Sequence, residues 1–256
     1  MANEKRIRSV SNATRLLVEL AGVDAPMRLN DLSDRLGMGK SSVHLLLATL
    51  ADAGFVEQTP QATYRLGLTA FEVGTAALQQ YGLGALLAPE LESLAERTRE
   101  AVSLSVLHDG GVLLVQRFES DQVLRASIRV GTRMPLQSSA SGRCILAFMP
   151  EPERAARLAA TGIPAAAVKR VLGRMQEIRD AGFETQQDEW SQGVSSIAVP
   201  VFGLGDQPVA ALSVSPPTIR FEPKPWIDPL FKTADELSVL LKSMAVGARQ
   251  LAGMSR

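Results

Sequence analysis

The chain has 256 residues, of which 46% are hydrophobic and 21% charged, and its formal net charge is zero. This composition fits a soluble globular protein of one large or two ordinary domains, and the neutral charge does not by itself predict a nucleic-acid binder. The single cysteine excludes an intrachain disulfide, no apolar run is long enough to span a membrane, and the polar N-terminus lacks a signal-peptide pattern, so we expect a cytoplasmic protein.

The first part of the chain predicts three helices. A first helix is expected over 9–21, with Ser9 as its cap. A second begins at Asn30, whose side chain can accept a free N–H of the opening turn, and it ends at Gly37. The inward residues of the first helix are predicted as Val10, Ala13, Leu17 and Leu20, and the third helix carries a buried face at helical spacing formed by Val43, Leu46, Leu47 and Leu50.

A tight hairpin formed by 55–58 and 63–66 follows the third helix, and this order is that of a winged helix-turn-helix. The helices alone fit a small bundle equally well, but the hairpin favours DNA binding. Hydroxyls and a cation at a helix N-terminus suit phosphates and base edges. The predicted DNA contacts are Arg6, Arg8, Lys40, Ser41, Ser42, His44, Thr49 and Arg65. Because residues 1–80 hold eight basic and eight acidic side chains, a single subunit should bind weakly, which favours binding by more than one.

Residues 69–83 predict a helix whose apolar face includes Phe71, Val73 and Leu78. This helix could be a solvated linker or a seam between two copies of the chain, and the apolar face favours the seam. We therefore divide the chain into a winged helix-turn-helix domain (1–68), a linker helix (69–83) and a second domain (84–256).

The second domain mixes helical and strand-like patterns. Helices are expected over 85–99 with a kink at Pro89, over 139–148 with Ser138 or Ser139 as the cap, over 153–160 and 165–181, and from Pro225 onward. Strands are expected over 102–107, 112–118, 124–130, 183–187, 196–202 and 209–215. The domain is therefore predicted as α+β, with an antiparallel sheet that can hold a small ligand on one face.

Catalytic and metal-binding patterns are weak. Cys144 and the two histidines, His44 and His108, lie in separate elements, and neither a nucleophile elbow, a phosphate-binding loop nor a dinucleotide fingerprint is present. We therefore expect no catalytic site, no metal and no cofactor. The hydroxyls of Ser213 and Ser215 share one face of a strand, where they could bond to each other or to backbone, or bind a ligand carboxylate or carbonyl.

The run LNDLSDRLGMGKSSVHLLLATLADAGFVEQ resembles the N-terminal domain of the IclR-type family of bacterial transcription regulators. The segments PLQSSASGRCILAF, GVSSIAVPVF and PVAALSVS resemble the effector-binding domain of that family, in family order. One position departs from the pattern, because Leu45 stands where the family often has Arg. The resemblance implies a GAF-like C-terminal domain, and it places the effector at Ala126, Met134, Ala140, Ser141, Gln186, Val194, Ser196, Ser213 and Ser215.

Together these observations predict a ligand-responsive regulator that binds double-stranded operator DNA in the bacterial cytoplasm, as a homodimer or a dimer of dimers. The resemblance implies control of a catabolic or metabolic operon, more often by repression. The small Ala126 and the uncharged Gln186 favour an effector larger than a keto acid of two or three carbons, such as an aromatic or branched organic acid or its amide. The alternatives are an enzyme that uses the C-terminal cleft and a constitutive DNA-binding protein with a vestigial pocket.

Overall fold

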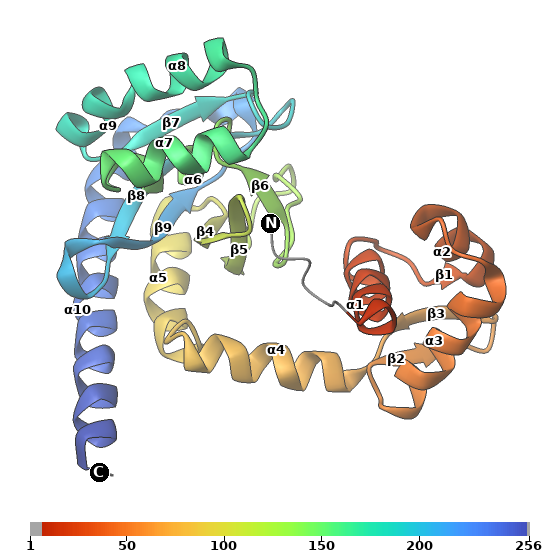
Figure 1. Ribbon diagram of the computed structural model, residues 1–256. Coiled ribbons are helices and arrows are strands. Elements are labelled where there is room, and N and C mark those ends of the chain that lie inside the picture. Colours follow the sequence, from red (N-terminus) through yellow and green to blue (C-terminus); the bar gives the residue numbers. More distant parts are fainter. Residues whose placement is uncertain (1–6, 255–256) are drawn as a thin grey trace. The chain divides into compact units, whose positions relative to one another are not determined.

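The computed structural model describes residues 7–254, and the chain divides into two compact units after Gln80 (Figure 1). In the first unit, three helices pack against a small antiparallel sheet of strand order β1-β3-β2, and a fourth helix follows. The helices are α1 (Arg8–Ala21), α2 (Leu29–Leu36), α3 (Lys40–Asp52) and α4 (Leu68–Gln80), and the strands are β1 (Met27–Arg28), β2 (Val56–Gln58) and β3 (Thr63–Leu66).

The core of the first unit differs from the prediction in the first helix. Leu16 is fully buried, whereas Val10 lies in the first turn of α1 and is 56% exposed. The predicted face and the observed face of α1 both have helical spacing. The packing of α1 against the other elements selects the face that contains Leu16 and Leu20. The predicted inward residues of α3 do face the core, with Val43 and Leu47 fully buried.

Two predicted caps also differ. The N-cap position of α2 is Arg28 instead of Asn30, and that of α1 is Ile7 instead of Ser9, in both cases without a side-chain capping bond. Strand β1, which the sequence did not predict, explains the first difference. It pairs with β3 and brings the chain directly into the helix at Leu29.

The second unit is built on a six-stranded, wholly antiparallel sheet of order β6-β5-β4-β9-β8-β7. Its strands are β4 (Val102–His108), β5 (Gly111–Phe118), β6 (Arg133–Pro135), β7 (Glu184–Gln187), β8 (Ser195–Phe202) and β9 (Pro208–Val214). Its α-helices are α5 (Ala88–Thr98), α6 (Ala140–Ala147), α7 (Glu151–Ala160), α8 (Ala165–Gly173), α9 (Met175–Ala181) and α10 (Lys224–Met254), with short 3-10 turns at Ala85–Leu87, Leu204–Asp206 and Thr218–Arg220.

The sheet lies between helices. Helix α6 packs on β8 and β9 from one side, and α10 covers the other side together with α5 (Figure 1). Helix α6 is enclosed so completely that all eight of its residues are buried. An α+β fold with an antiparallel sheet was predicted, and it is confirmed. Within residues 7–254, no helix has both the length and the apolar character needed to cross a membrane.

Three local predictions for the second unit are wrong. Residues 124–130 form no strand, and β6 is the edge strand instead, because β5 pairs with residues 133–135. The helix predicted over 165–181 is interrupted at Arg174, which separates α8 from α9. Pro89 kinks no helix, since it lies in the first turn of α5, where proline is readily accommodated.

Gly142 allows α6 to approach the preceding loop closely. A Cβ atom at this position would lie 2.7 Å from both the Cα and the carbonyl oxygen of Leu136. We expect Gly142→Ala to destabilise the second unit by about 1–3 kcal/mol through overpacking, although alanine favours helices. The control is Gly173→Ala, where no atom lies within 4 Å and the free energy of unfolding should rise by up to about 1 kcal/mol. Urea unfolding measures both, and equal effects of the two variants would contradict the close approach.

Candidate functional site

The exposed side of α3 carries five of the eight residues predicted to contact DNA. Lys40, Ser41 and Ser42 form the first turn of the helix, and His44 and Thr49 continue the same exposed surface. Lys40 forms no ion pair with any described residue, so its charge is available to a phosphate. Leu45, in the same surface, is 69% exposed.

The turn before α3 is held in a defined conformation. Gly37 adopts a left-handed backbone with φ of 64°. The Ser33 hydroxyl donates to the Met38 carbonyl at 2.5 Å, and the Arg15 guanidinium donates to the Leu36 carbonyl at 3.1 Å. These bonds satisfy groups at the end of α2 and fix the position at which α3 begins.

The predicted arginine contacts have different environments. Arg8 is exposed at the start of α1, and Arg6 lies outside the described residues. Arg65 in β3 forms a 2.8 Å ion pair with Glu57 of β2, and both side chains are partly exposed. Since an exposed pair of this kind contributes little stability, Arg65 could exchange Glu57 for a phosphate at small cost.

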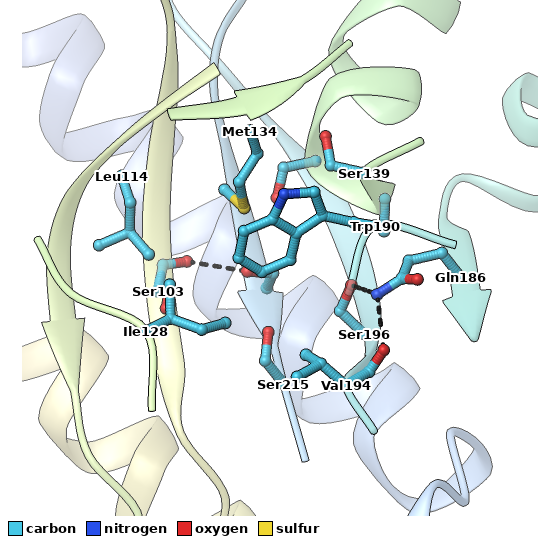
Figure 2. A pocket seen from close by; sticks show the side chains of 13 residues that line it. Ser103, Leu114, Ile128, Met134, Ser139, Gln186, Trp190, Val194, Ser196 and Ser215 are labelled. Carbon is cyan, nitrogen blue, oxygen red and sulfur yellow. Dashed lines mark hydrogen bonds between the residues drawn. The ribbon is translucent and has the colours of Figure 1, made fainter. Parts of the chain in front are cut away.

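In the second unit, a cavity lies between the sheet, the start of α6 and the loop that joins β7 to β8 (Figure 2). It brings together eight of the nine residues predicted to contact an effector: Met134, Ala140, Ser141, Gln186, Val194, Ser196, Ser213 and Ser215. Ala126 is the exception, because it is buried outside the cavity lining and its carbonyl accepts a 2.6 Å hydrogen bond from Arg117. The cavity is also lined by residues that sequence reasoning missed, namely Ser103, Leu114, Ile128, Ser139 and Trp190.

The floor of the cavity is a face of the sheet that carries hydroxyl groups. Ser103 of β4 lies opposite Ser213 of β9, and Ser215 follows two residues later, so it points to the same side. Ser196 of β8 lies opposite Gln186 of β7. The strand register thus explains why serines distant in sequence line one surface, which we call the hydroxyl face (Ser103, Ser196, Ser213 and Ser215).

Two serines at the cavity have hydroxyls that bond to no described residue, and the oxygen atoms of both remain accessible to solvent. Ser141 is 4% exposed and Ser215 6%, and neither side chain forms a recorded bond. Ser141 belongs to the first turn of α6, which begins after the cap residue Ser139. The lining residues carry no charged side chain. An anionic ligand would therefore be held by hydroxyls and by the N–H groups at the start of α6.

The Gln186 amide already forms hydrogen bonds through both its nitrogen and its oxygen. Its nitrogen donates to the Val194 carbonyl at 3.2 Å and to the Ser196 hydroxyl at 3.3 Å (Figure 2). Its oxygen accepts the Glu189 backbone N–H at 3.0 Å. Gln186 thereby ties together the two ends of the β7–β8 loop. Its donor and acceptor serve the loop, a role that sequence spacing could not reveal.

A buried cluster of charges lies behind the start of α6. The Arg143 side chain, 2% exposed, donates to Glu184 at 2.8 Å and to both carboxylate oxygens of Glu189, at 2.6 and 3.0 Å. Arg174 lies 2.9 Å from Glu184. Burial raises the pKa of the Glu184 carboxyl, and the two arginines oppose that rise by favouring its charged form.

The possible catalytic residues do not form a site. Cys144 is wholly buried in α6, and burial raises the pKa of its thiol well above the ordinary value, so it is a poor nucleophile. His108 is exposed at the β4–β5 hairpin, 3.3 Å from the Arg133 guanidinium. Among the described residues, no group of three or more histidine, cysteine or acidic side chains could hold a metal ion.

A winged helix-turn-helix joined to a separate α+β domain is the architecture of a DNA-binding transcriptional regulator. Comparison with known families agrees with this class. The family described as "Bacterial transcriptional regulator IclR C-terminal" matches residues 75–239, and "IclR helix-turn-helix domain" matches residues 9–60. The chain belongs to the IclR family of bacterial transcriptional regulators, and its relatives are regulators of transcription, not enzymes.

Individual relatives share most of their length with this chain. The glycerol operon regulatory protein of Streptomyces griseus is 34% identical over 227 residues, which cover 86% of this chain and 88% of that protein. The crystal structure of an IclR-type regulator from Alicyclobacillus acidocaldarius is similar with a TM-score of 0.79 at 26% identity, covering 92% of this chain and 99% of the other. An IclR homologue from Microbacterium hydrocarbonoxydans, solved in complex with 4-hydroxybenzoate, has the same fold with a TM-score of 0.77 at 23% identity, covering 91% and 98%.

Arg143→Leu should be strongly destabilising, by about 3–5 kcal/mol, because it leaves the buried Glu184 carboxylate without its main partner. The control is Arg157→Leu, which removes an exposed ion pair with Glu153 and should cost less than about 1 kcal/mol. Both tryptophans lie in the second unit, so urea unfolding followed by tryptophan fluorescence reports on that unit alone. A cost for Arg143→Leu no larger than that of the control would contradict the structural role of the cluster.

Proposed function

We propose that the protein is a ligand-responsive repressor of a catabolic or metabolic operon, in which an organic acid in the second unit controls DNA binding by the first. The observation that carries this proposal is the cavity, which gathers hydroxyls that bond to no described residue beside the N-terminus of α6. These hydroxyls line the cavity and form no bond to a described residue, so they can bind a ligand carboxylate or carbonyl without first breaking a bond within the protein.

The first unit would bind DNA through α3 in the major groove, with Lys40, Ser41 and Ser42 at phosphates and His44 and Thr49 toward the bases. Relatives that have Arg at the position of Leu45 would form one additional contact with DNA there. The DNA sequence that this chain prefers should therefore differ from theirs at the base pair that faces Leu45.

Binding would require at least two copies of the chain. In α4, Leu68, Phe71 and Val73 are 74%, 71% and 55% exposed, an arrangement that a second copy could cover. Two linked DNA-binding domains, each with no net charge, would bind DNA more tightly than one domain alone. Sedimentation velocity tests this, and a full-length monomer at micromolar concentration would rule it out.

The effector would be an organic acid held at its carboxylate. Ser141, Ser215 and the N–H groups at the start of α6 supply the polar contacts, while Met134 and Val194 contact its hydrophobic part. The 4-hydroxybenzoate bound to the Microbacterium hydrocarbonoxydans homologue is an acid of this kind. The effector changes DNA binding only as far as its affinity differs between the DNA-bound and free conformations.

Lys40→Ala should weaken binding to every DNA sequence and reduce the slope of log affinity against log salt by about one unit per site. His44→Ala should instead relax the preference at one or two base pairs, at about 1–3 kcal/mol per lost base contact. The control is Lys169→Ala in α8, an exposed lysine of the second unit, which should leave both quantities unchanged. Fluorescence anisotropy with a selected operator fragment measures all three, and wild-type affinity in both α3 variants would contradict the assignment of α3.

Ser215→Ala should weaken the binding of a carboxylic acid about 10- to 100-fold, because a hydrogen bond to a charged group contributes about 1.5–3 kcal/mol. Calorimetry with 4-hydroxybenzoate and pyruvate measures this, and Ser243→Ala on the exposed surface of α10 is the control. Unchanged affinity in Ser215→Ala would contradict the carboxylate position. DNA affinity that does not respond to any bound acid would favour the constitutive alternative.

A further inference from the structure

We infer that the indole of Trp190 is the gate of the cavity and determines effector specificity, turning outward as a side chain to admit a planar aromatic acid and then packing against its ring. Trp190 lies in the β7–β8 loop, and its indole extends across the cavity between Met134 and Ser196 (Figure 2). This inference rests on the proposed function, because it concerns the ligand of the same cavity.

The size of the cavity requires that some wall moves. Its volume is about 20 Å³, which is about the room needed by one water molecule. Even the smallest organic acids have several non-hydrogen atoms and exceed this volume. A lining residue must therefore leave its present position before an acid can reach the hydroxyl face.

Most walls cannot move without breaking the core. The hydroxyl face belongs to β4, β8 and β9, which are hydrogen-bonded on both sides within the sheet. Helix α6 is buried throughout, and Gly142 packs directly on Leu136. Trp190 is different, since it is only half-buried and has solvent on one side into which its ring can turn.

The backbone around Trp190 is fixed, which restricts the movement to the side chain. On one side, the Glu189 N–H is bound by Gln186 at 3.0 Å, and its carboxylate by Arg143 at 2.6 and 3.0 Å. On the other side, the Gly193 N–H donates to Asp188 at 2.6 Å. Lifting the whole loop would break these bonds, whereas rotating the indole about its side-chain torsions breaks none of them.

The chemistry of the neighbouring residues defines the ligand. When the indole turns, the space that it leaves lies between the hydroxyl face and the apolar side chains of Leu114, Ile128 and Met134. A flat acid can place its carboxylate at the hydroxyls and its ring beside the indole. Aromatic rings favour offset or edge-to-face contact with one another, so a planar ring should bind more tightly than a puckered ring of the same size.

The test uses the full chain with Trp226→Phe as the background, so that Trp190 is the only tryptophan. Trp226 does not line the cavity and packs beside Phe221, 6.1 Å between ring centroids. Titration with 4-hydroxybenzoate should change the Trp190 emission and its quenching by acrylamide. Calorimetry then compares benzoate with cyclohexanecarboxylate in this background and with Trp190→Phe or Trp190→Ala added.

We expect the background protein and Trp190→Phe to prefer benzoate over cyclohexanecarboxylate by about 2- to 10-fold. Trp190→Ala should lose that preference and should bind both acids with a faster association rate, because the gate is absent. Equal preference in Trp190→Ala and the background, with both acids still bound, would overturn this inference and leave the proposed function standing. Failure of every variant to bind any of the acids would overturn both.

Discussion

Arg143 carries a positive charge into the interior of the second unit. The segments that border the cavity supply the acceptor groups that bind this charge. Its guanidinium is bound by two carboxylates and by the carbonyls of Gln137 and Thr185. These partners come from the segment before α6, from β7 and from the β7–β8 loop. One side chain thus fixes the relative positions of three elements that border the cavity, and a buried arginine left without partners would be too costly to keep.

This arrangement separates charge from ligand recognition. The charges neutralise one another behind α6, while the cavity itself presents hydroxyls, backbone N–H groups and apolar side chains. A site of this kind can hold a carboxylate without a direct cation, and the large difference in polarity between its floor and its walls orients a ligand that has one polar end.

The first unit differs from the second in where its functional side chains lie, because they are on the exposed surface and not in a cavity. Its core is a small set of apolar side chains, mostly leucines and valines, and the exposed side of α3 carries few charges, so under the proposed function the attraction of each copy to DNA would be modest. Weak binding by each copy would make the proposed complex with DNA sensitive to the geometry of the second copy. A regulator can exploit that sensitivity, because a small change in spacing then has a large effect on affinity.

The residue pattern was enough to predict the winged helix-turn-helix, the antiparallel sheet, the Ser139 cap and the shared face of Ser213 and Ser215, because these depend on local capping, turns and strand alternation. The resemblance to a family located eight of the nine expected effector positions at one cavity. The remaining features became clear from the packing of the folded chain. It placed Ala126 away from the cavity, engaged the Gln186 amide within its own loop, replaced the strand at 124–130 by β6, and brought Trp190 over the hydroxyl face. These features depend on contacts between residues far apart in the chain and on the direction of side chains in a loop, and neither leaves a periodic signal in the sequence.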